Sequence, residues 1–202
     1  MSKPKKRNRF FVFLIITSLL FLGYKLSIQL NFNPHYSAGQ KMDSLNHVIV
    51  YCNGDLGDNS GRSVTADNYN LGLKYQCVEF IKRYYYEVYN HKMPNTYGNA
   101  LDFYNKSLKD GELNTERNLI QYTNGSFSKP EIGDLLVLDG TISNKFGHVA
   151  IISNVNEEEI EIIQQNTSES RDNIDLDLID NKWKVDKSRV LGWLRKAFKM
   201  KL

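Results

Sequence analysis

The chain has 202 residues, which is enough for one globular domain with an appended segment. Its 26 Lys and Arg residues against 23 Asp and Glu residues give a net charge of +3, but six of the basic residues and no acid lie within residues 1–25. The rest of the chain therefore carries a net charge of −3. Its basic residues are dispersed among acids, so we expect no nucleic-acid-binding surface.

Residues 1–9 are basic, and an uncharged apolar run follows over residues 10–24. A helix over this run measures only ~22 Å, against a hydrocarbon core of roughly 30 Å. Extension to Leu30 gives about 31 Å if Lys25 snorkels to the far interface. A signal anchor and a cleaved signal peptide both fit this pattern. The small residues that a signal peptidase needs lie well beyond the run, at residues 37–39, and we therefore favour the anchor.

We predict five segments from these patterns. Residues 1–9 form a cytoplasmic basic segment, residues 10–30 a transmembrane signal anchor, and residues 31–46 a polar tether. A single folded domain spans residues 47–196, and residues 197–202 form a basic tail. Because the basic amino end stays in the cytoplasm, the domain is expected outside it, in the periplasm or the extracellular space.

No metal ion and no cofactor is predicted for this chain. The acidic loop at residues 54–61 lacks the alternating oxygen ligands and terminal Glu of an EF-hand, so we expect a surface turn. The two cysteines and four histidines show no spacing typical of zinc sites. Cys52, after an expected strand at residues 48–51, is interpreted as a small, partly buried residue, because nothing in the sequence brings it close to Cys77.

Residues 77–90 are predicted to form an amphipathic helix. Apolar side chains recur from Cys77 at three- and four-residue spacing, and charged side chains fall on the other side. Cys77 then lies in the first turn on the buried face, where unpaired N–H groups and the helix dipole lower the pKa of a thiol. The pattern also fits a small buried core cysteine.

Further elements are expected downstream. A second helix is predicted over residues 96–109, and a turn at residues 130–134 leads into a strand at residues 134–138. Asp134 is expected to accept backbone hydrogen bonds in this turn rather than to act as a catalytic acid. The basic cluster that begins at Arg195 is interpreted as a solvated, frayed tail.

Two antiparallel strands are predicted on either side of a turn centred on Asn156. In this register His148 faces Gln164 and Ile152 faces Ile160, and the even-numbered residues face the core. A slip of one residue would turn Gln164 to the other face of the sheet. The register therefore predicts that Gln164 lies beside His148.

Cys77 and His148 are the two residue types that catalyse acyl transfer through a thiol. An imidazole can take the proton of the thiol and later donate it to the leaving amine. His148 alone would also fit a satisfied core histidine. The pair predicts a nucleophile and a base supplied by distant segments.

Several short stretches resemble the CHAP family of cysteine, histidine-dependent amidohydrolases and peptidases. They occur in the family's order and at compatible spacings, over roughly residues 46 to 195. Within the family, the chain is most similar to the amidase part of glutathionylspermidine synthetase/amidase. The matching stretches are Tyr75-Gln76-Cys77-Val78-Glu79-Phe80, Pro130-Glu131-Ile132-Gly133-Asp134, Gly147-His148-Val149-Ala150-Ile151 and Gln165-Asn166.

The resemblance implies an α+β, papain-like cysteine amidase/peptidase fold, in which N-terminal helices pack on a small antiparallel sheet. It implies Cys77 as the nucleophile and His148 as the base. Most relatives carry a Glu at the position of Gln164; an amide oxygen can orient an imidazole, but it does not stabilise the imidazolium as a carboxylate does. Asn166 is a second candidate for the orienter, and Gln76 a candidate for supporting the oxyanion beside the backbone N–H of Cys77.

An anchored domain that faces outward meets the cell wall. We therefore predict a thiol amidohydrolase or peptidase that cleaves amide bonds in peptidoglycan or in another amide-containing substrate. The resemblance implies a glutathionylspermidine amidase-like hydrolase as the alternative. Gln164 leaves a further possibility, a catalytically silent module that binds cell wall or peptide.

Overall fold

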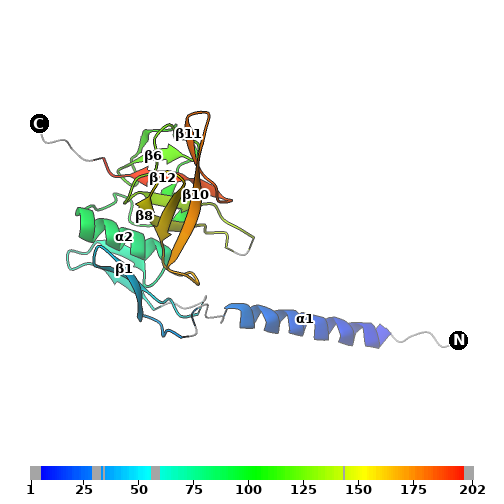
Figure 1. Ribbon diagram of the computed structural model, residues 1–202. Helices are drawn as coiled ribbons and strands as arrows, with labels where there is room; N and C mark the ends of the chain where they lie inside the picture. The colour runs from blue at the N-terminus through cyan, green and yellow to red at the C-terminus, as the bar shows by residue number, and fades with distance from the viewer. Residues whose placement is uncertain (1–5, 29–32, 34, 56–59, 143, 198–202) are drawn as a thin grey trace, which may run out of the picture.

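The structure is a computed structural model that describes residues 6–28, 33, 35–55, 60–142 and 144–197. Most of the predicted basic segment, most of the predicted basic tail and the middle of the acidic loop lie outside these residues. Figure 1 shows one long amino-terminal helix and a separate folded body. Mixed helix and sheet content was expected and is confirmed, although the body is mostly sheet.

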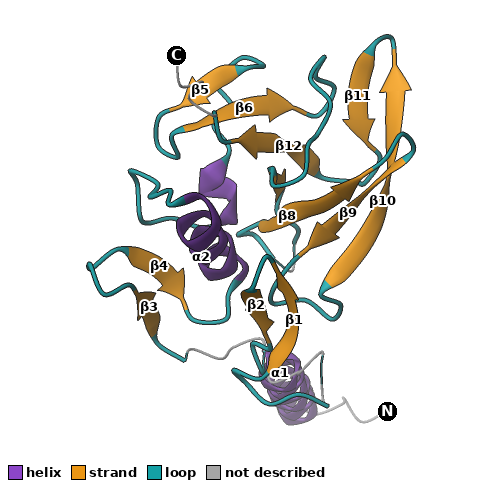
Figure 2. Ribbon diagram, turned by 60° about the vertical axis from the view of Figure 1, so that its left-hand side comes forward, coloured by secondary structure: helices purple, strands orange, loops and turns teal. Residues whose placement is uncertain are grey.

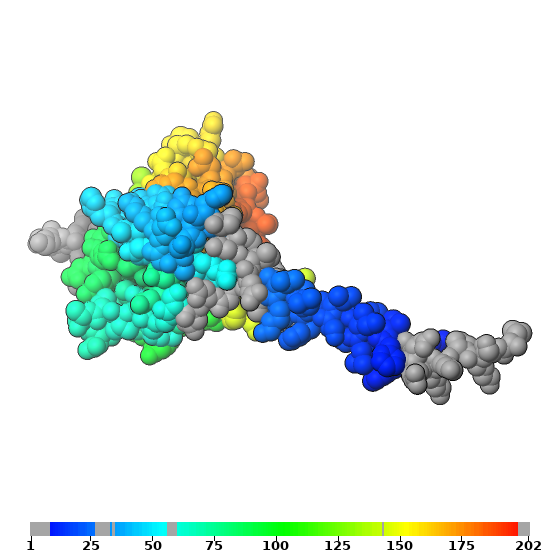
Figure 3. Space-filling model, turned by 90° about the horizontal axis from the view of Figure 1, so that it is seen from below, coloured from blue at the N-terminus to red at the C-terminus, as the bar shows by residue number. Residues whose placement is uncertain are grey.

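Helix α1 (Lys6–Ile28) contains the apolar run identified in the sequence. Over residues 9–26 it is long and apolar enough to cross a membrane, and none of this stretch is buried inside the protein. At 1.5 Å per residue its 23 residues span about 34 Å. Figure 3 shows it projecting from the folded body. It agrees with the expected apolar helix, whereas its role as an anchor stays a prediction.

The body is organised around one antiparallel sheet of eight strands, in the order β11-β10-β9-β8-β7-β12-β6-β5. The expectation of a small sheet is therefore wrong. The strands are β5 (Glu112–Asn114), β6 (Leu119–Thr123), β7 (Leu135–Leu138), β8 (His148–Val155), β9 (Glu159–Ile163), β10 (Arg171–Ile179), β11 (Lys182–Val185) and β12 (Val190–Arg195).

One α-helix packs against this sheet, and two hairpins pack against the helix. The predicted amphipathic helix is confirmed as α2 (Cys77–Tyr89). It contacts β8 of the large sheet and one strand of each hairpin, as Figure 2 shows. The hairpins are β1 (Lys41–Leu45) with β2 (Val48–Tyr51), and β3 (Arg62–Val64) with β4 (Asn70–Leu73).

The central strands bury side chains on both faces. Val149 and Ile151 pack in the core that contains α2, whereas Ala150 and Ile152 pack in a second core between the central strands and β10, β11 and β12. All four side chains are 0% exposed. The prediction that the even-numbered residues face the core is confirmed, but the odd-numbered residues of the central strands are buried as well, because the large sheet has a hydrophobic core on each side.

The register of the β8–β9 hairpin differs from the prediction by two residues. Ile152 lies opposite Ile162 rather than Ile160, because the turn is closed between Asn156 and Glu159 instead of being centred on Asn156, and a bulge at Ser153 then shifts the pairing by one residue. The hydroxyl of Ser153 donates to the backbone oxygen of Glu161 at 3.1 Å. A shift of two residues preserves the face of every side chain, so His148 and Gln164 still share one face.

The predicted second helix over residues 96–109 is wrong in extent. Only a 3-10 helix forms, η1 (Ala100–Phe103), started by a capping box between Asn99 and Asp102. Beyond it, the side chain of Gln121 accepts from the backbone N–H of Asn105 and donates to its carbonyl. These two bonds occupy the backbone groups that a continuing helix would use.

Two boundary predictions also need correction. Strand β1 lies inside the segment expected to be a polar tether over residues 31–46, so the folded body begins before residue 47. Arg195, expected in a solvated tail, is part of β12 and binds Asp134 with Nε–Oδ1 2.9 Å and Nη2–Oδ2 2.7 Å. The expected role of Asp134 is confirmed, because its Oδ2 accepts from the backbone N–H of Glu131 at 2.8 Å.

Candidate active site

Cys77 is the first residue of α2. The extended backbone of Gln76 forms the N-cap, and Tyr75 before it has a φ of 65°, so the chain turns sharply into the helix. The Cys77 side chain is 9% exposed. The nearby backbone N–H groups of Val149, Val78 and Cys77 itself favour the thiolate form of its sulfur and act to lower its pKa. The thiol therefore lies against the peptide unit that follows His148.

The amino-terminal end of β8, near which the thiol of Cys77 lies, is left unpaired on the side of β9. The pairing of β8 with β9 begins at Ile151, so β9 does not pair with the first residues of β8. Gly147 has a φ of 73°, and a Cβ there would lie 2.6 Å from the backbone oxygen of Leu138. Only glycine fits this turn into β8, which sets the direction from which His148 enters the strand.

Gln164 lies beside His148, with its Oε1 3.0 Å from the Nε2 of the imidazole. The amide nitrogen of Gln164 donates to the backbone oxygen of Glu169 at 3.2 Å. This second bond turns Oε1 toward the imidazole and so assigns the proton to Nε2 of a neutral ring. Nδ1 then carries the lone pair, which is the form that can accept a proton from a thiol.

The protonation states differ from the prediction of a lowered thiol pKa. Burial raises the pKa of Cys77, although the three backbone N–H groups favour the thiolate. Burial also lowers the pKa of His148 to about 4; Gln164 opposes this shift, and the charges of Lys187 and Arg189 add to it. The resting pair at neutral pH is therefore a thiol and a neutral imidazole.

The other two candidate residues bind each other rather than His148. Asn166 donates from Nδ2 to Oε1 of Gln76 at 2.6 Å, and Gln76 donates from Nε2 to Oδ1 of Asn53 at 3.3 Å. Asn166 therefore has no contact with the imidazole among the described residues. Gln76 is held immediately before Cys77 by these two bonds.

Comparisons with known proteins identify the family to which this part of the chain belongs. A family comparison matches residues 67–166 to the CHAP domain. This range contains Cys77, His148, Gln76, Gln164 and Asn166, whereas Asn53 lies outside it. The chain carries a CHAP domain.

Two further proteins are similar to this chain. Trypanothione synthetase of Crithidia fasciculata is 32% identical over 120 residues, which is 59% of this chain and 18% of that protein. The chain thus spans about a fifth of the length of this curated relative. The crystal structure of Ly7917 matches 68% of this chain and 56% of that chain, with 14% identity and a TM-score of 0.34.

The CHAP domain also contains a buried polar network that sequence reasoning missed. Gln165 is 1% exposed, and its Oε1 accepts from the backbone N–H of Tyr51 at 2.8 Å. Its Nε2 donates to the backbone oxygen of Gln76 at 3.1 Å and to Oε2 of Glu79 at 3.0 Å. Glu79 is in turn paired with Arg83 at 2.7 Å. Gln165 thereby joins the segment after β9 to the start of α2.

A signal for Gln165 was present, because it belongs to the Gln165-Asn166 stretch that resembles the family. Its partners come from β2 and α2, which are distant in the sequence. No local pattern pairs these segments. The sequence therefore indicated that Gln165 is important, but it did not predict which residues Gln165 contacts.

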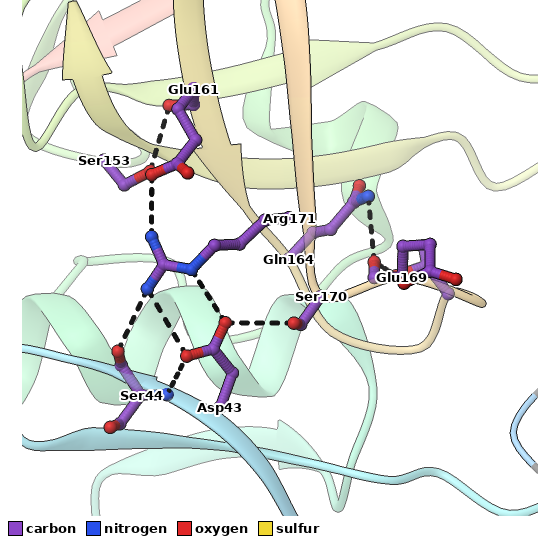
Figure 4. A network of polar contacts seen from close by, with 9 residues as sticks. Asp43, Ser44, Ser153, Glu161, Gln164, Glu169, Ser170 and Arg171 are labelled. Atoms are coloured by element: carbon purple, nitrogen blue, oxygen red, sulfur yellow. Dashed lines mark hydrogen bonds and ion pairs between the residues drawn. The ribbon is translucent and has the colours of Figure 1, made fainter.

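A second network fastens the first hairpin to the CHAP domain. The guanidinium of Arg171 donates to Asp43 at 2.8 Å, to Glu161 at 2.7 Å and to the backbone oxygen of Ser44 at 3.2 Å. Figure 4 shows Arg171 between these groups, close to Gln164. Burial opposes ionisation of Asp43, but its hydrogen bonds, above all with Arg171, outweigh burial and lower its pKa.

No group of three metal-ligating side chains occurs in the part of the chain that the structure describes. The two cysteines are both free. Cys52 is buried, and its sulfur donates to the backbone oxygen of Tyr36 at 3.7 Å.

Proposed function

We propose that the chain is a membrane-anchored thiol amidohydrolase that cleaves amide bonds in peptidoglycan. The CHAP domain supports an amidase or peptidase activity of some kind. The observation that carries the finer proposal is that the backbone N–H of Val149 lies near enough to the Cys77 sulfur to lower its pKa against the effect of burial, because Val149 adjoins His148. A thiol beside the strand that carries a histidine suits covalent catalysis.

The reaction proceeds in two steps. The sulfur of Cys77 attacks the carbonyl carbon of the amide as its proton passes to Nδ1 of His148. His148 donates this proton to the leaving amine, the C–N bond breaks, and an acyl thioester remains on Cys77. Water then attacks the thioester, with His148 as the base, and releases the acid and the free thiol.

A neutral thiol on Cys77 and a neutral imidazole on His148 before substrate binds are compatible with these two steps. With the pKa of Cys77 raised and that of His148 lowered, the charged pair arises during attack, when the substrate carbonyl accepts the negative charge. The backbone N–H of Cys77, at the start of α2, is suited to bind that oxyanion. Gln164 holds the imidazole of His148 through its bond to Nε2, which leaves the lone pair of the neutral ring on Nδ1.

The substrate preference follows from the amino-terminal helix. An apolar helix after a basic segment favours insertion with the basic end in the cytoplasm and the domain outside. An amidase on that side of the membrane meets cell-wall peptides. The helix acts as the anchor in this proposal, and the body adopts a papain-like arrangement of helix and sheet.

A second substrate is favoured by one specific observation. The similarity to trypanothione synthetase over 59% of the chain supports a substrate in which a glutathione peptide is linked to a polyamine. The same thiol chemistry would cleave that amide. Such a substrate needs to be present on the side of the membrane that the domain faces.

The test is digestion of purified peptidoglycan by the full chain in detergent, with the masses of the released products as the readout. We expect soluble fragments that carry new amino termini, and none with Cys77→Ala. Glutathionylspermidine is incubated in parallel. Cleavage of glutathionylspermidine with intact peptidoglycan would replace the substrate, and cleavage of neither would favour a silent binding module.

A further inference from the structure

The loop between β9 and β10 contains the groups that orient the imidazole of the candidate site. This Gln164 loop, residues 164–170, is closed by a bond of 2.9 Å from the backbone N–H of Gln164 to the carbonyl of Ser170. The side chain of Gln164 bonds to His148 through Oε1, and its Nε2 donates to the backbone oxygen of Glu169 at 3.2 Å. The orientation of the imidazole therefore depends on where the loop places the carbonyl of Glu169.

Residues between α1 and β2 contact this loop. The hydroxyl of Ser170 donates to Oδ2 of Asp43 at 2.9 Å, and the next residue, Arg171, donates to the same oxygen through Nε at 2.8 Å. Nearer to α1, Nδ2 of Asn33 donates to the backbone oxygen of Thr167 at 2.8 Å. The chain that follows α1 is thus bonded to the loop at both of these positions.

Asp43 is a well-anchored acceptor. It lies on β1 opposite Val50 of β2, and its Oδ1 accepts from the backbone N–H of Ser44 at 2.7 Å. Burial acts to raise the pKa of Asp43, but its hydrogen bonds, above all with Arg171, lower it, so the side chain is a carboxylate at neutral pH. A carboxylate accepts stronger hydrogen bonds than a neutral oxygen does. Figure 4 shows Asp43 bonded to both Ser170 and Arg171.

The peptide unit between Glu169 and Ser170 connects Asp43 to the imidazole. Its carbonyl is the acceptor for Gln164, and the residue on its other side is bound by Asp43. If this carbonyl moves away, the amide of Gln164 is free to turn over and to present Nε2 to the imidazole. The ring would then carry its proton on Nδ1, and no lone pair would remain there to take the proton of Cys77.

We propose that Asp43 is a positioning residue that holds His148 in the tautomer with a proton on Nε2, acting through Ser170 and the Gln164 loop. This inference rests on the proposed function. It makes a residue from the segment that follows α1 part of the arrangement that prepares the base. A contact that only fastened β1 to the sheet would affect stability and leave the tautomer unchanged.

Glu161 provides a matched control for Asp43. Both carboxylates bind the guanidinium of Arg171, at 2.7 Å for Glu161 and 2.8 Å for Asp43, and their side chains are 29% and 23% exposed. Each also accepts from one serine hydroxyl, that of Ser153 on β8 for Glu161 and that of Ser170 for Asp43. Replacement of either by alanine therefore removes the same kinds of contact, but only Asp43 is bonded to the loop.

The test observes the imidazole directly, by nitrogen NMR of the full chain in detergent, isotopically labelled at histidine. The shift of each ring nitrogen reports whether that nitrogen carries the proton. The signals of His148 are those that disappear in His148→Ala. Near neutral pH the wild type should show a protonated Nε2 and an unprotonated Nδ1. Gln164→Ala gives the reference shifts of an imidazole without its orienting amide.

Asp43→Ala should move both nitrogen shifts of His148 toward those of Gln164→Ala, because the two tautomers then exchange. Ser170→Ala, which leaves the ion pair of Asp43 in place, should move them in the same direction. For the substrate that the wild type cleaves, kcat of Asp43→Ala should fall by about three- to tenfold with KM unchanged, the effect of one lost hydrogen bond. Glu161→Ala should keep the wild-type shifts and kcat.

Wild-type shifts in Asp43→Ala would overturn the inference, and wild-type shifts in Ser170→Ala would overturn the route through Ser170. Equal changes in Asp43→Ala and Glu161→Ala would also overturn it, because loss of any contact with Arg171 would then be sufficient. If Asp43→Ala does not fold, Ser170→Ala decides. Failure of the proposed hydrolysis gives a different pattern: peptidoglycan stays intact with every variant, whereas the nitrogen shifts still depend on Asp43.

Discussion

Gln164 holds His148 through a bond of 3.0 Å between Oε1 and Nε2, and its own amide nitrogen is fixed by the backbone oxygen of Glu169. This pair of contacts selects one tautomer and one orientation of the imidazole. An amide performs this role without adding charge. Burial lowers the pKa of His148, and the bond from Gln164 only partly opposes this shift, so the base is neutral rather than an imidazolium held by a carboxylate.

Replacement of Gln164 tests this orienting role. Gln164→Ala frees the imidazole, and we expect the rate of amide hydrolysis to fall roughly 10- to 100-fold, since general base catalysis depends on alignment. Gln164→Glu should raise the pKa of His148 and shift the acidic limb of the pH–rate profile to higher pH. The pH dependence of kcat/KM is the measurement, and an Ala variant with wild-type activity would remove Gln164 from the mechanism.

The pH dependence of Cys77 alkylation tests the neutral resting pair. Because the pKa of Cys77 is raised and that of His148 is about 4, the thiol predominates between these values, and alkylation by iodoacetamide should rise as the pH increases beyond 9. A stable thiolate–imidazolium pair would instead give a high plateau from pH 4 to 8. Rates are followed by mass spectrometry, with Cys52→Ser as the control.

Removal of Gln165 should reduce both stability and activity. Gln165→Ala removes three hydrogen bonds and leaves buried Glu79 without one partner, so we expect a loss of about 2–4 kcal/mol in the free energy of unfolding. Urea unfolding of the full chain in detergent measures this loss. Asn173→Ala, at an exposed position, should change stability by less than about 0.5 kcal/mol. Equal stabilities of the two variants would show that the network does not hold α2.

Helix α1 should determine membrane association. The full chain is expected to float with phospholipid vesicles and to resist extraction by alkaline carbonate, because burial of 18 apolar-rich residues is strongly favourable. A chain that lacks residues 1–28 should stay in the soluble fraction. Protease added outside intact cells should digest the domain; protection from the protease would contradict the extracytoplasmic placement.

Local patterns predicted the elements that local forces determine. Helix α2 follows from the spacing of its apolar residues, and the placement of Cys77 in its first turn follows directly. The strand that begins at His148 could also be predicted from its run of apolar residues. The shared face of His148 and Gln164 survived a register error of two residues because side chains alternate with a period of two.

Long-range contacts account for what could not be predicted. The bulge at Ser153 depends on its hydroxyl meeting Glu161, and the helix expected after η1 is replaced by bonds from Gln121, which lies on β6. The raised pKa of Cys77 likewise reflects burial by the assembled sheet, which outweighs the effect of the helix start. None of these contacts leaves a periodic signal in the sequence.

The most direct measurement traps the covalent intermediate. The full chain is mixed with a peptidyl p-nitrophenyl ester, quenched in acid within milliseconds, and analysed by intact mass and peptide mapping. The account predicts one acyl group on Cys77, formed together with one equivalent of p-nitrophenol, absent in Cys77→Ala and formed roughly 100-fold more slowly or less in His148→Ala. An acyl group on another residue, or an undiminished burst of p-nitrophenol from Cys77→Ala, would contradict it.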